Sequence, residues 1–316
     1  MNDITTIKLK PVFQQKIWGG RRLEKYFGNL LPTGNIGECW LISAHPNGDT
    51  IVDGGPLDGM PLSQVYRQHK HLFGNSSYSE FPLIIKIIDA SDDLSVQVHP
   101  DDNYAHTIGQ PYGKEEAWLI LEPSIDRMVQ LGHYAQSKEQ LSHLITNGEW
   151  KRLLKYYPIA KNDLVPVKPG TLHAILKGTM ILEIQQSSDT TYRLYDYDRL
   201  DDAGNKRPLH IKESIEVISV PDPAGGPIHI QEALKQQTAM LWSGHYFSIH
   251  EWNVTTQMNV ILESGNFYLL TILSGTGTIN GVPCQMGDAV IITSLAKTID
   301  IKGKMRIVTA IPAKGA

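Results

Sequence analysis

Short runs of alternating or continuous apolar residues dominate the chain and predict β-strands over most of its length. In the first two thirds, strand patterns occur at 37–43, 81–88, 94–99, 117–121, 163–167, 179–185 and 191–197. The run at 81–88 is almost continuously apolar and rich in β-branched residues, which favours a central strand covered on both faces. Lys86 in its middle is the exception, because a buried charge needs a partner or a polar cavity.

Short helices are expected between some of these strands. A largely apolar helical stripe covers 62–73 and has a stop signal at Gly74. Residues 137–140 have the form of a capping box, and the apolar spacing after them predicts two short helices within 137–157. A third helical stripe covers 211–218, whereas 103–113 is predicted to be a loop.

The last third of the chain consists almost wholly of short strand patterns. They occur at 247–254, 267–274, 277–279, 289–293, 297–301 and 305–310. Gly and Asn turns between them favour a β-sandwich or barrel. Because a Pro- and Gly-rich stretch at 221–227 precedes this part, we expect two β domains, residues 1–225 with helices inserted near 137–157 and residues 226–316.

Composition narrows the function classes. A length of 316 residues suits two domains, and 41% hydrophobic with 20% charged residues is typical of a soluble globular protein. The net charge is -4 and no run of Lys or Arg occurs, so nucleic acid is not an expected partner. No apolar run approaches the ~20 residues that span a bilayer. With no secretion signal and two cysteines expected to stay reduced, we predict a cytoplasmic protein without membrane contact.

One strand and two later segments carry candidate metal ligands. Alternation within 94–99 places Ser95, Gln97 and His99 on one face and two valines on the other. Glu116 and His173 add a carboxylate and a second imidazole, and this set suits a divalent metal of borderline softness. Each residue alone has an ordinary explanation, since a single histidine on a strand is usually at the surface or hydrogen-bonded.

Three further residues are candidates for moving a proton or holding an anion. Lys114 lies two positions before Glu116 and shares its face if that segment is extended. Glu183 lies in an apolar strand pattern, where burial would raise its pKa and suit it to proton transfer. Arg193 could stabilise a developing negative charge or hold a phosphate. Two structural alternatives remain open: Lys86 could pair with a buried carboxylate, and Glu183 could pair with Arg193.

Taken in order, these segments look like the two-part cupin motif. A longer set of motifs resembles the type I phosphomannose isomerases, particularly their short bacterial form, and the resemblance covers most of the chain. The motifs that carry it are Ser95-Val-Gln-Val-His-Pro-Asp101, Gly113-Lys-x-Glu-x-Trp118, Pro169-Gly-Thr-x-His-Ala174, Glu183 with Ser188-Asp-x-Thr-x-Arg193, Trp18-Gly19 and Gly37-Glu38.

The resemblance implies a mainly β fold of two cupin-like jelly-roll β-barrel domains. The C-terminal part has the Gly-Asp turn of a cupin but no set of metal ligands, so we expect it to bind no metal. It implies reversible isomerisation of D-mannose 6-phosphate to D-fructose 6-phosphate, by proton transfer between C1 and C2 through a cis-enediol. One Zn2+ per chain would be bound by Gln97, His99, Glu116 and His173. The catalytic residues would be Lys114, Glu183 and Arg193, and the substrate pocket would be lined by Ser95 and Lys86.

Two other function classes fit parts of the pattern. An iron-dependent cupin oxygenase would use the same two histidines and glutamate. A non-catalytic sugar-phosphate-binding protein would bind without turnover. Gln97 beside lysine and arginine favours a phosphorylated sugar over oxygen chemistry, and a sensor has no need of Lys114, Glu183 and Arg193. The residue that takes the proton from carbon stays open, as do the sugar preference and a native metal such as cobalt or manganese. Asp189 and His106 are weaker candidates outside the predicted site.

Overall fold

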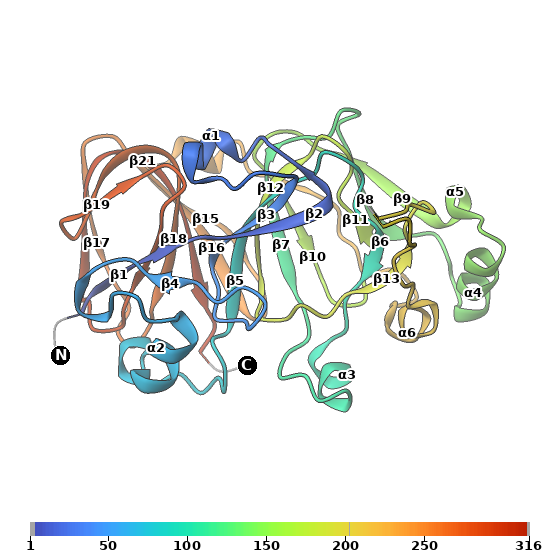
Figure 1. The fold of residues 1–316 in the computed structure, drawn as a ribbon, viewed down its shortest axis with the longest axis horizontal. Helices are drawn as coiled ribbons and strands as arrows, with labels where there is room; N and C mark the ends of the chain where they lie inside the picture. The colour runs from blue at the N-terminus through green and yellow to red at the C-terminus, as the bar shows by residue number, and fades with distance from the viewer. Residues whose placement is uncertain (1–3, 202, 315–316) are drawn as a thin grey trace.

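The computed structural model describes residues 4–201 and 203–314, and their strands form three sheets (Figure 1). We call the sheet of seven strands the central sheet, the sheet of five the small sheet and the sheet of nine the C-terminal sheet. Strands far outnumber helices in the described part, so the prediction of a mainly β protein is confirmed. None of the described helices is long and apolar enough to cross a membrane.

The central sheet contains the predicted central strand. Its strands are, from one edge to the other, β14 (Ile228–His229), β10 (Asp163–Val167), β7 (Glu116–Glu122), β12 (Met180–Gln186), β5 (Leu83–Asp89), β3 (Ile36–Ile42) and β2 (Val12–Gly20). All seven residues of β5 are buried, because both of its faces are covered. Lys86 is therefore buried within this strand, as the sequence pattern indicated.

The small sheet lies beside the central sheet and away from the C-terminal sheet (Figure 1). Its strands are β13 (Tyr192–Tyr195), β6 (Val96–Val98), β11 (His173–Ala174), β8 (Met128–His133) and β9 (Leu154–Pro158). The strand β8 has no counterpart among the sequence predictions, and β9 replaces the end of the second predicted helix. Residues 154–158 form a strand because their backbone amides and carbonyl oxygens pair with those of β8.

Helices occupy the loops between strands. They are α1 (Glu24–Phe27), α2 (Leu62–Gln68), α3 (Asp102–Thr107), α4 (Lys138–Thr146), α5 (Trp150–Leu153) and α6 (Ile211–Val217), with 3-10 helices at Gly28–Leu30, Gly55–Leu57, Lys70–Phe73 and Ala233–Lys235. The predicted start of α4 is confirmed, since Ser137 Oγ accepts a hydrogen bond from the Gln140 amide over 3.2 Å. The return bond of the predicted capping box differs, because Gln140 Oε1 accepts from the Gln136 amide over 2.8 Å. The predicted helices at 62–73 and 211–218 are also present, although His69 divides the first into α2 and a 3-10 turn.

The prediction of a loop over 103–113 was wrong in its first half, which forms α3. Asp101 is the N-cap of this helix, and its Oδ1 accepts a hydrogen bond from the Tyr104 amide over 2.8 Å. The signal was present in the sequence, because an aspartate directly before a polar helical turn is a typical start. Asp102, the first residue of the helix, accepts a hydrogen bond at Oδ1 from Gln186 Nε2 at the end of β12 over 3.0 Å.

The C-terminal sheet contains longer strands than the sequence predicted, and three strands from the last third of the chain that it did not predict. Its main path is β15 (Thr238–Ser243), β16 (Phe247–Val254), β21 (Thr298–Pro312), β18 (Tyr268–Ile279), β20 (Ala289–Ile292), β1 (Thr6–Lys10) and β4 (Ile51–Val52), with β17 (Gln257–Ile261) paired to β21 and β19 (Val282–Gln285) paired to β18. The strands β15, β17 and β19 were not predicted. The two predicted strands at 267–279 are one, as are the two at 297–310. A bulge between Ile272 and Ser274 lets β18 bend without ending, so the glycines after it do not interrupt the pairing with β21.

The sheets do not follow the chain order strictly. The N-terminal strand β1 pairs with β20 of the C-terminal sheet, and β14 pairs with β10 of the central sheet. No closed barrel occurs among the strand pairings of the described residues, so the barrel part of the predicted fold is not confirmed. The jelly-roll description and the division into residues 1–225 and 226–316 stay predictions.

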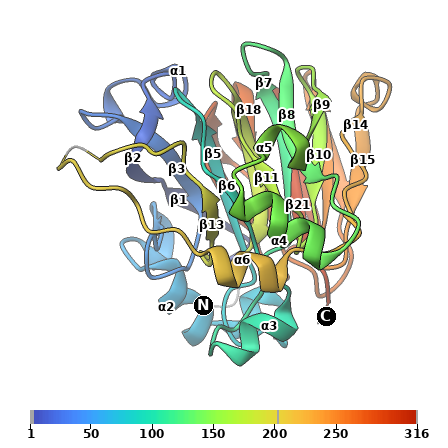
Figure 2. The ribbon, with the colours of Figure 1, turned by 90° about the vertical axis from the view of Figure 1, so that its right-hand side faces the viewer.

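Three apolar layers hold the sheets together. One joins the central and C-terminal sheets, a second joins the central and small sheets, and a third packs the small sheet against α4, α5 and α6. These helices form the outer end of the molecule, and Figure 2 shows them in front of the small sheet. Because the central sheet is covered on both sides, alternate residues of each of its strands enter different layers.

Candidate metal and substrate site

A row of charged side chains crosses one face of the central sheet. Glu38, Lys86, Glu183 and Glu116 come from the adjacent strands β3, β5, β12 and β7. Lys86 is directly opposite Glu183 in the register, and Gln185 of β12 is opposite Glu116. Because side chains alternate along a strand, this row shares its face with the layer between the central and small sheets.

The small sheet supplies the opposite wall of the site. Its register places Gln97 of β6 between His173 of β11 and Arg193 of β13. His99 follows β6 directly, as the alternation with Gln97 predicts. The ring of His173 lies 5.4 Å from that of Trp118 on β7, centroid to centroid, so the two sheets meet at this point.

Two histidines and a glutamate converge at the base of this site. His99 Nε2 lies 3.5 Å from Glu116 Oε2, and His173 Nε2 lies 3.4 Å from Glu116 Oε1. The ligand atoms of the three residues lie within 4.8 Å of one another, and all three side chains are buried. The amide nitrogen of Gln97 lies 3.4 Å from His173 Nε2. All four predicted metal ligands are thus brought together.

Hydrogen bonds orient both imidazoles. His99 Nδ1 lies 2.9 Å from the Thr190 carbonyl oxygen, and His173 Nδ1 lies 2.9 Å from that of Thr171. Because a carbonyl oxygen only accepts, each Nδ1 carries the proton and each Nε2 presents a lone pair. Burial lowers the pKa of His173 to about 4, and burial together with Lys114 lowers that of His99 well below its usual value. Both rings are neutral at pH 7.

The Glu116 carboxylate fits a bound cation. Both of its oxygens are buried and accept no hydrogen bond from the described residues, although Lys114 Nζ lies 3.0 Å from Oε2. A buried carboxylate without hydrogen bonds is costly unless a cation compensates it. Two neutral imidazoles and a carboxylate form a donor set for zinc and similar divalent metals. A half-turn of the Gln97 amide would present Oε1 as a fourth ligand.

Lys86 and Glu183 form a buried ion pair beside these ligands. The distance from Lys86 Nζ to Glu183 Oε2 is 2.7 Å, and Glu38 Oε2 lies 3.9 Å from the same nitrogen. The indole nitrogen of Trp118 donates a hydrogen bond to Glu183 Oε1 over 2.9 Å. Of the two open alternatives, Lys86 does pair with a buried carboxylate, whereas Glu183 pairs with Lys86 rather than with Arg193.

The environment separates the pKa values of the two carboxylates. Burial raises the pKa of Glu183, and the attraction of Lys86 offsets only part of that shift. Burial alone would also raise the pKa of Glu38, but Lys86 and Lys16 together lower it to about 2. Glu38 is therefore a fixed negative charge, whereas Glu183 is the carboxylate better suited to take up a proton.

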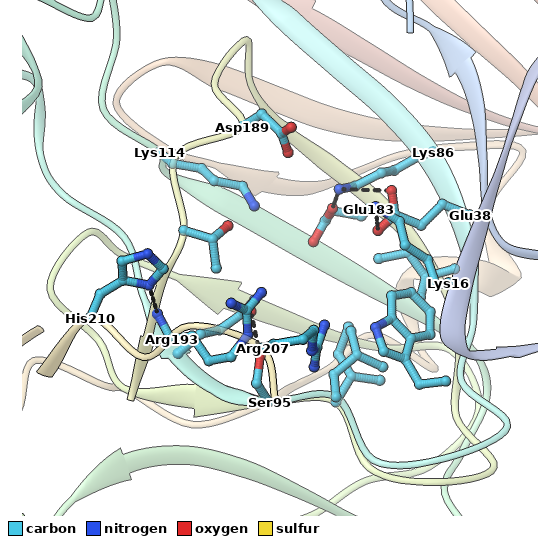
Figure 3. A pocket seen from close by; sticks show the side chains of 16 residues that line it. Lys16, Glu38, Lys86, Ser95, Lys114, Glu183, Asp189, Arg193, Arg207 and His210 are labelled. Atoms are coloured by element: carbon cyan, nitrogen blue, oxygen red, sulfur yellow. Dashed lines mark hydrogen bonds and ion pairs between the residues drawn. The ribbon is translucent and has the colours of Figure 1, made fainter. Parts of the chain in front are cut away.

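A cavity of about 280 Å³ lies next to the ligand group, and Figure 3 shows the side chains that line it. The predicted site residues that line it are Lys86, Ser95, Gln97, Lys114, Glu183 and Arg193. His99, Glu116 and His173 are not among the lining residues, but they lie next to two that are. Gln97 contacts His173, and Lys114 contacts both His99 and Glu116. The structure thus gathers all nine predicted residues in one place, while their roles stay predictions.

Several lining residues were not among the predicted ones. They include Lys16, Trp18, Glu38, Asp189, Arg207 and His210. Trp18 and Glu38 lie within motifs that carried the resemblance, and Asp189 had been placed outside the site, so a signal existed for these three. His106, the other weak candidate, is exposed and does not line the cavity.

One side of the cavity carries an excess of positive charge. Arg207 and Arg199 both pair with the Asp196 carboxylate, and Arg199 also lies 3.5 Å from Asp92 Oδ2. Arg193 has no carboxylate partner among the described residues, and its Nη1 donates to the Pro208 carbonyl oxygen over 3.0 Å. Burial and the nearby charge of Arg207 lower the pKa of Arg193. Figure 3 shows Arg193 and Arg207 apart from the Lys86, Glu183 and Glu38 group, so this side suits an anion.

Comparisons with known proteins agree with this geometry. Residues 6–142 match the family model described as phosphomannose isomerase type I, catalytic domain. The chain is 41% identical over 306 residues to a mannose-6-phosphate isomerase of Streptococcus mutans, which covers 96% of each protein. The chain belongs to the type I phosphomannose isomerase family. A mannose-6-phosphate isomerase of Bacillus subtilis is 44% identical over 271 residues, or 85% of each protein.

Solved structures of this family show the same fold. The crystal structure of a Bacillus subtilis mannose 6-phosphate isomerase superimposes with a TM-score of 0.89 at 34% identity, covering 97% of this chain and 99% of that one. A putative mannosephosphate isomerase from Archaeoglobus fulgidus, at 19% identity and a TM-score of 0.77, shows the fold alone. The resemblance identified from the sequence motifs is confirmed at the level of the family.

Proposed function

We propose that this protein catalyses the reversible isomerisation of D-mannose 6-phosphate to D-fructose 6-phosphate, with one Zn2+ held by Gln97, His99, Glu116 and His173. One observation carries the proposal: the buried Glu116 carboxylate, which accepts no hydrogen bond from the described residues and has Lys114 Nζ 3.0 Å from one oxygen, faces two imidazole lone pairs. Gln97 and Lys114 connect this group to a charged cavity that they line. The names of the relatives supply the substrate, since both curated proteins above are mannose-6-phosphate isomerases.

The reaction needs three things from the cavity. A proton must leave C2 of the aldose and return at C1, the oxygens on both carbons must be stabilised as charge develops in the cis-enediol, and the phosphate must be held. A bound zinc ion would supply a Lewis acid that polarises the substrate oxygens. The remaining steps fall to side chains of the chain itself.

Glu183 and Lys114 are the candidates for moving protons. Glu183 lines the cavity in a buried position that raises its pKa, which brings a carboxyl group closer to the value that suits general base catalysis near neutral pH. Lys86 keeps the ionised form available through its 2.7 Å ion pair. Lys114 Nζ lies 3.0 Å from Glu116, next to the proposed zinc position, where an ammonium can donate a proton to a substrate oxygen.

The arginine side of the cavity is the proposed phosphate site. Arg193 has no carboxylate partner among the described residues, and Arg207 has only a share of Asp196. A phosphate dianion would compensate this excess charge through charge-assisted hydrogen bonds. Ser95 Oγ, which lies 3.4 Å from Gln97 Oε1, lines the wall between the phosphate side and the proposed zinc ligands.

A coupled assay tests the proposal. Purified protein is given mannose 6-phosphate, and fructose 6-phosphate is read through auxiliary enzymes, with mannose and glucose 6-phosphate as comparison substrates. We expect turnover of mannose 6-phosphate that chelator removes and zinc restores. No turnover in a folded, zinc-loaded sample would contradict the proposal. Oxygen uptake with iron would then identify an oxygenase, and a thermal shift with mannose 6-phosphate but no turnover would identify a sensor.

A further inference from the structure

The segment that carries Lys114 and Glu116 is held by the C-terminal sheet as well as by its own sheet. Glu115 lies between the two site residues, and because successive side chains of an extended segment point to opposite sides, it points away from the cavity. Its side chain is nevertheless buried, with 7% of its surface exposed. A buried carboxylate in this place requires hydrogen-bond donors.

The donors come from the turn that joins β15 and β16, about 130 residues further along the chain. The amide of His245 donates a hydrogen bond to Glu115 Oε1 over 3.2 Å, and the Tyr246 backbone also bonds this carboxylate. A Cβ atom on Gly244 would lie 2.0 Å from the Trp242 ring and 2.5 Å from the same Glu115 oxygen, so both neighbours require glycine there. None of the three turn residues lines the cavity.

The main chain around Glu115 is fixed at successive amides. Its own amide donates to Gln186 Oε1 over 2.7 Å, and the Gln186 amide donates to the Glu115 carbonyl oxygen over 3.0 Å. The preceding Lys114 amide donates to the Pro100 carbonyl oxygen over 2.9 Å. Since Lys114 and Glu116 flank this peptide, its position sets where both of their side chains point.

We propose that Glu115 is a positioning residue: by binding the 244–246 turn, it fixes the segment that presents Lys114 and Glu116 to the metal and substrate. The inference rests on the proposed function. Through this contact the C-terminal sheet would influence the metal and substrate site, although the 244–246 turn contributes no residue to the cavity. Groups that orient metal ligands typically change metal affinity or activity by about 10–100-fold when they are removed.

The test compares Glu115→Ala and Gly244→Ala with the unmodified protein. The first removes the acceptor of the turn amides. The second adds a Cβ that overlaps the Glu115 carboxylate and the Trp242 ring, so the turn must move away from Glu115. Gly225→Ala is the matched control, because its added Cβ meets no atom within 4 Å and its φ is not positive. Affinity for Zn2+ is measured by competition with a chelator, with circular dichroism to verify folding and the coupled assay to read turnover.

We expect zinc affinity to fall about 10–100-fold in both variants and to stay unchanged in the control. The double variant should lose less than the two single losses combined, because both act on one contact. Glu115→Gln keeps an acceptor oxygen and should recover most of the affinity. Folded Ala variants with unchanged zinc affinity and turnover would overturn the inference and leave the proposed function standing. An unmodified protein that binds no zinc would overturn both.

Discussion

The two faces of the central sheet use the same strands for opposite purposes. Toward the C-terminal sheet, β5 and β12 present mainly apolar side chains, among them Ile85, Leu182 and Ile184, and polar residues on this side occur only at strand ends, as Asp89 and Gln186. Toward the small sheet, the alternate positions of the same strands carry Lys86 and Glu183. Alternation thus places a folding surface and a reaction surface one residue apart, and substitutions at neighbouring positions should have different consequences.

The charged face is tolerated because its groups compensate one another across strands. Lys86 contacts Glu183 and Glu38, and each carboxylate also accepts a hydrogen bond from an indole nitrogen. Removing one partner of a buried pair leaves an uncompensated charge, which costs about 3–5 kcal/mol in typical cases. The apolar face has no such dependence on single partners, since its stability is spread over many contacts. Four predictions test this contrast.

The largest effect is expected on the charged face. Glu183→Gln removes the proposed proton-transfer group while keeping its size and its hydrogen bond from Trp118. We expect kcat to fall by about 10²–10⁴-fold, the usual contribution of a general acid or base, with zinc content unchanged. Steady-state kinetics and metal analysis of the same sample measure both. A kcat within threefold of the unmodified protein would assign the proton transfer elsewhere, with Lys114 the next candidate.

The neighbouring position on the apolar face should behave in the opposite way. Leu182 is fully buried between the central and C-terminal sheets, so Leu182→Ala leaves a cavity and should lower the free energy of unfolding by about 2–5 kcal/mol. Since its side chain does not face the site, kcat per folded molecule should stay close to normal. Urea denaturation and kinetics at low temperature measure the two quantities. Loss of kcat with unchanged stability would break the division between the faces.

Acid should destabilise the charged face through Glu38. Its pKa is lowered to about 2 in the folded protein against 4.5 in the reference state, so the stabilisation is complete above pH 4.5 and disappears as the pH falls toward 2. The contribution is up to about 3 kcal/mol. Urea denaturation at pH 5, 4 and 3 should show a shallower pH dependence in Glu38→Gln than in the unmodified protein. Equal slopes would mean that Glu38 is not held as an anion by Lys86 and Lys16.

The smallest of the four effects concerns the arginine side of the cavity. Arg207→Ala should raise the KM for mannose 6-phosphate by about 10–100-fold, because one charge-assisted contact to phosphate contributes about 1.5–3 kcal/mol. Turnover of unphosphorylated mannose, where measurable, should change little. Arg152→Ala, which removes an exposed arginine far from the cavity, is the control. An equal loss for both sugars would indicate a structural role for Arg207.

Local motifs predicted the residues of the candidate site because most of these residues come in pairs on short extended segments. Gln97 and His99 are two positions apart on one strand, and Lys114 and Glu116 repeat that spacing, so alternation alone placed each pair on one face. The sequence prediction of the arginine side of the cavity was incomplete, because its residues do not all belong to such segments. Arg207 lies in the segment between β13 and α6, where no local motif marks it, and only the fold around Asp196 brings it into the cavity.

The fold was predicted less completely than the site. The central strand β5 and the start of α4 carry strong local signals and were found. The strand β9 was taken for the end of a helix, because its apolar residues fit both periods and only pairing with β8 decides between them. The long strands β18 and β21 were each divided at glycines that the sheet accommodates through a bulge or close pairing. Such non-local pairing leaves no mark in a single sequence.

The central claim is that the buried histidines and Glu116 hold one divalent metal on which isomerisation depends. The most direct measurement is turnover of mannose 6-phosphate by chelator-stripped protein as zinc is added in known amounts, with Glu116→Gln treated in parallel. We predict that turnover rises linearly to one equivalent of zinc and then stays constant, and that the variant stays inactive at one equivalent. Full turnover by stripped protein in which metal analysis detects no zinc, iron, cobalt or manganese would contradict the claim.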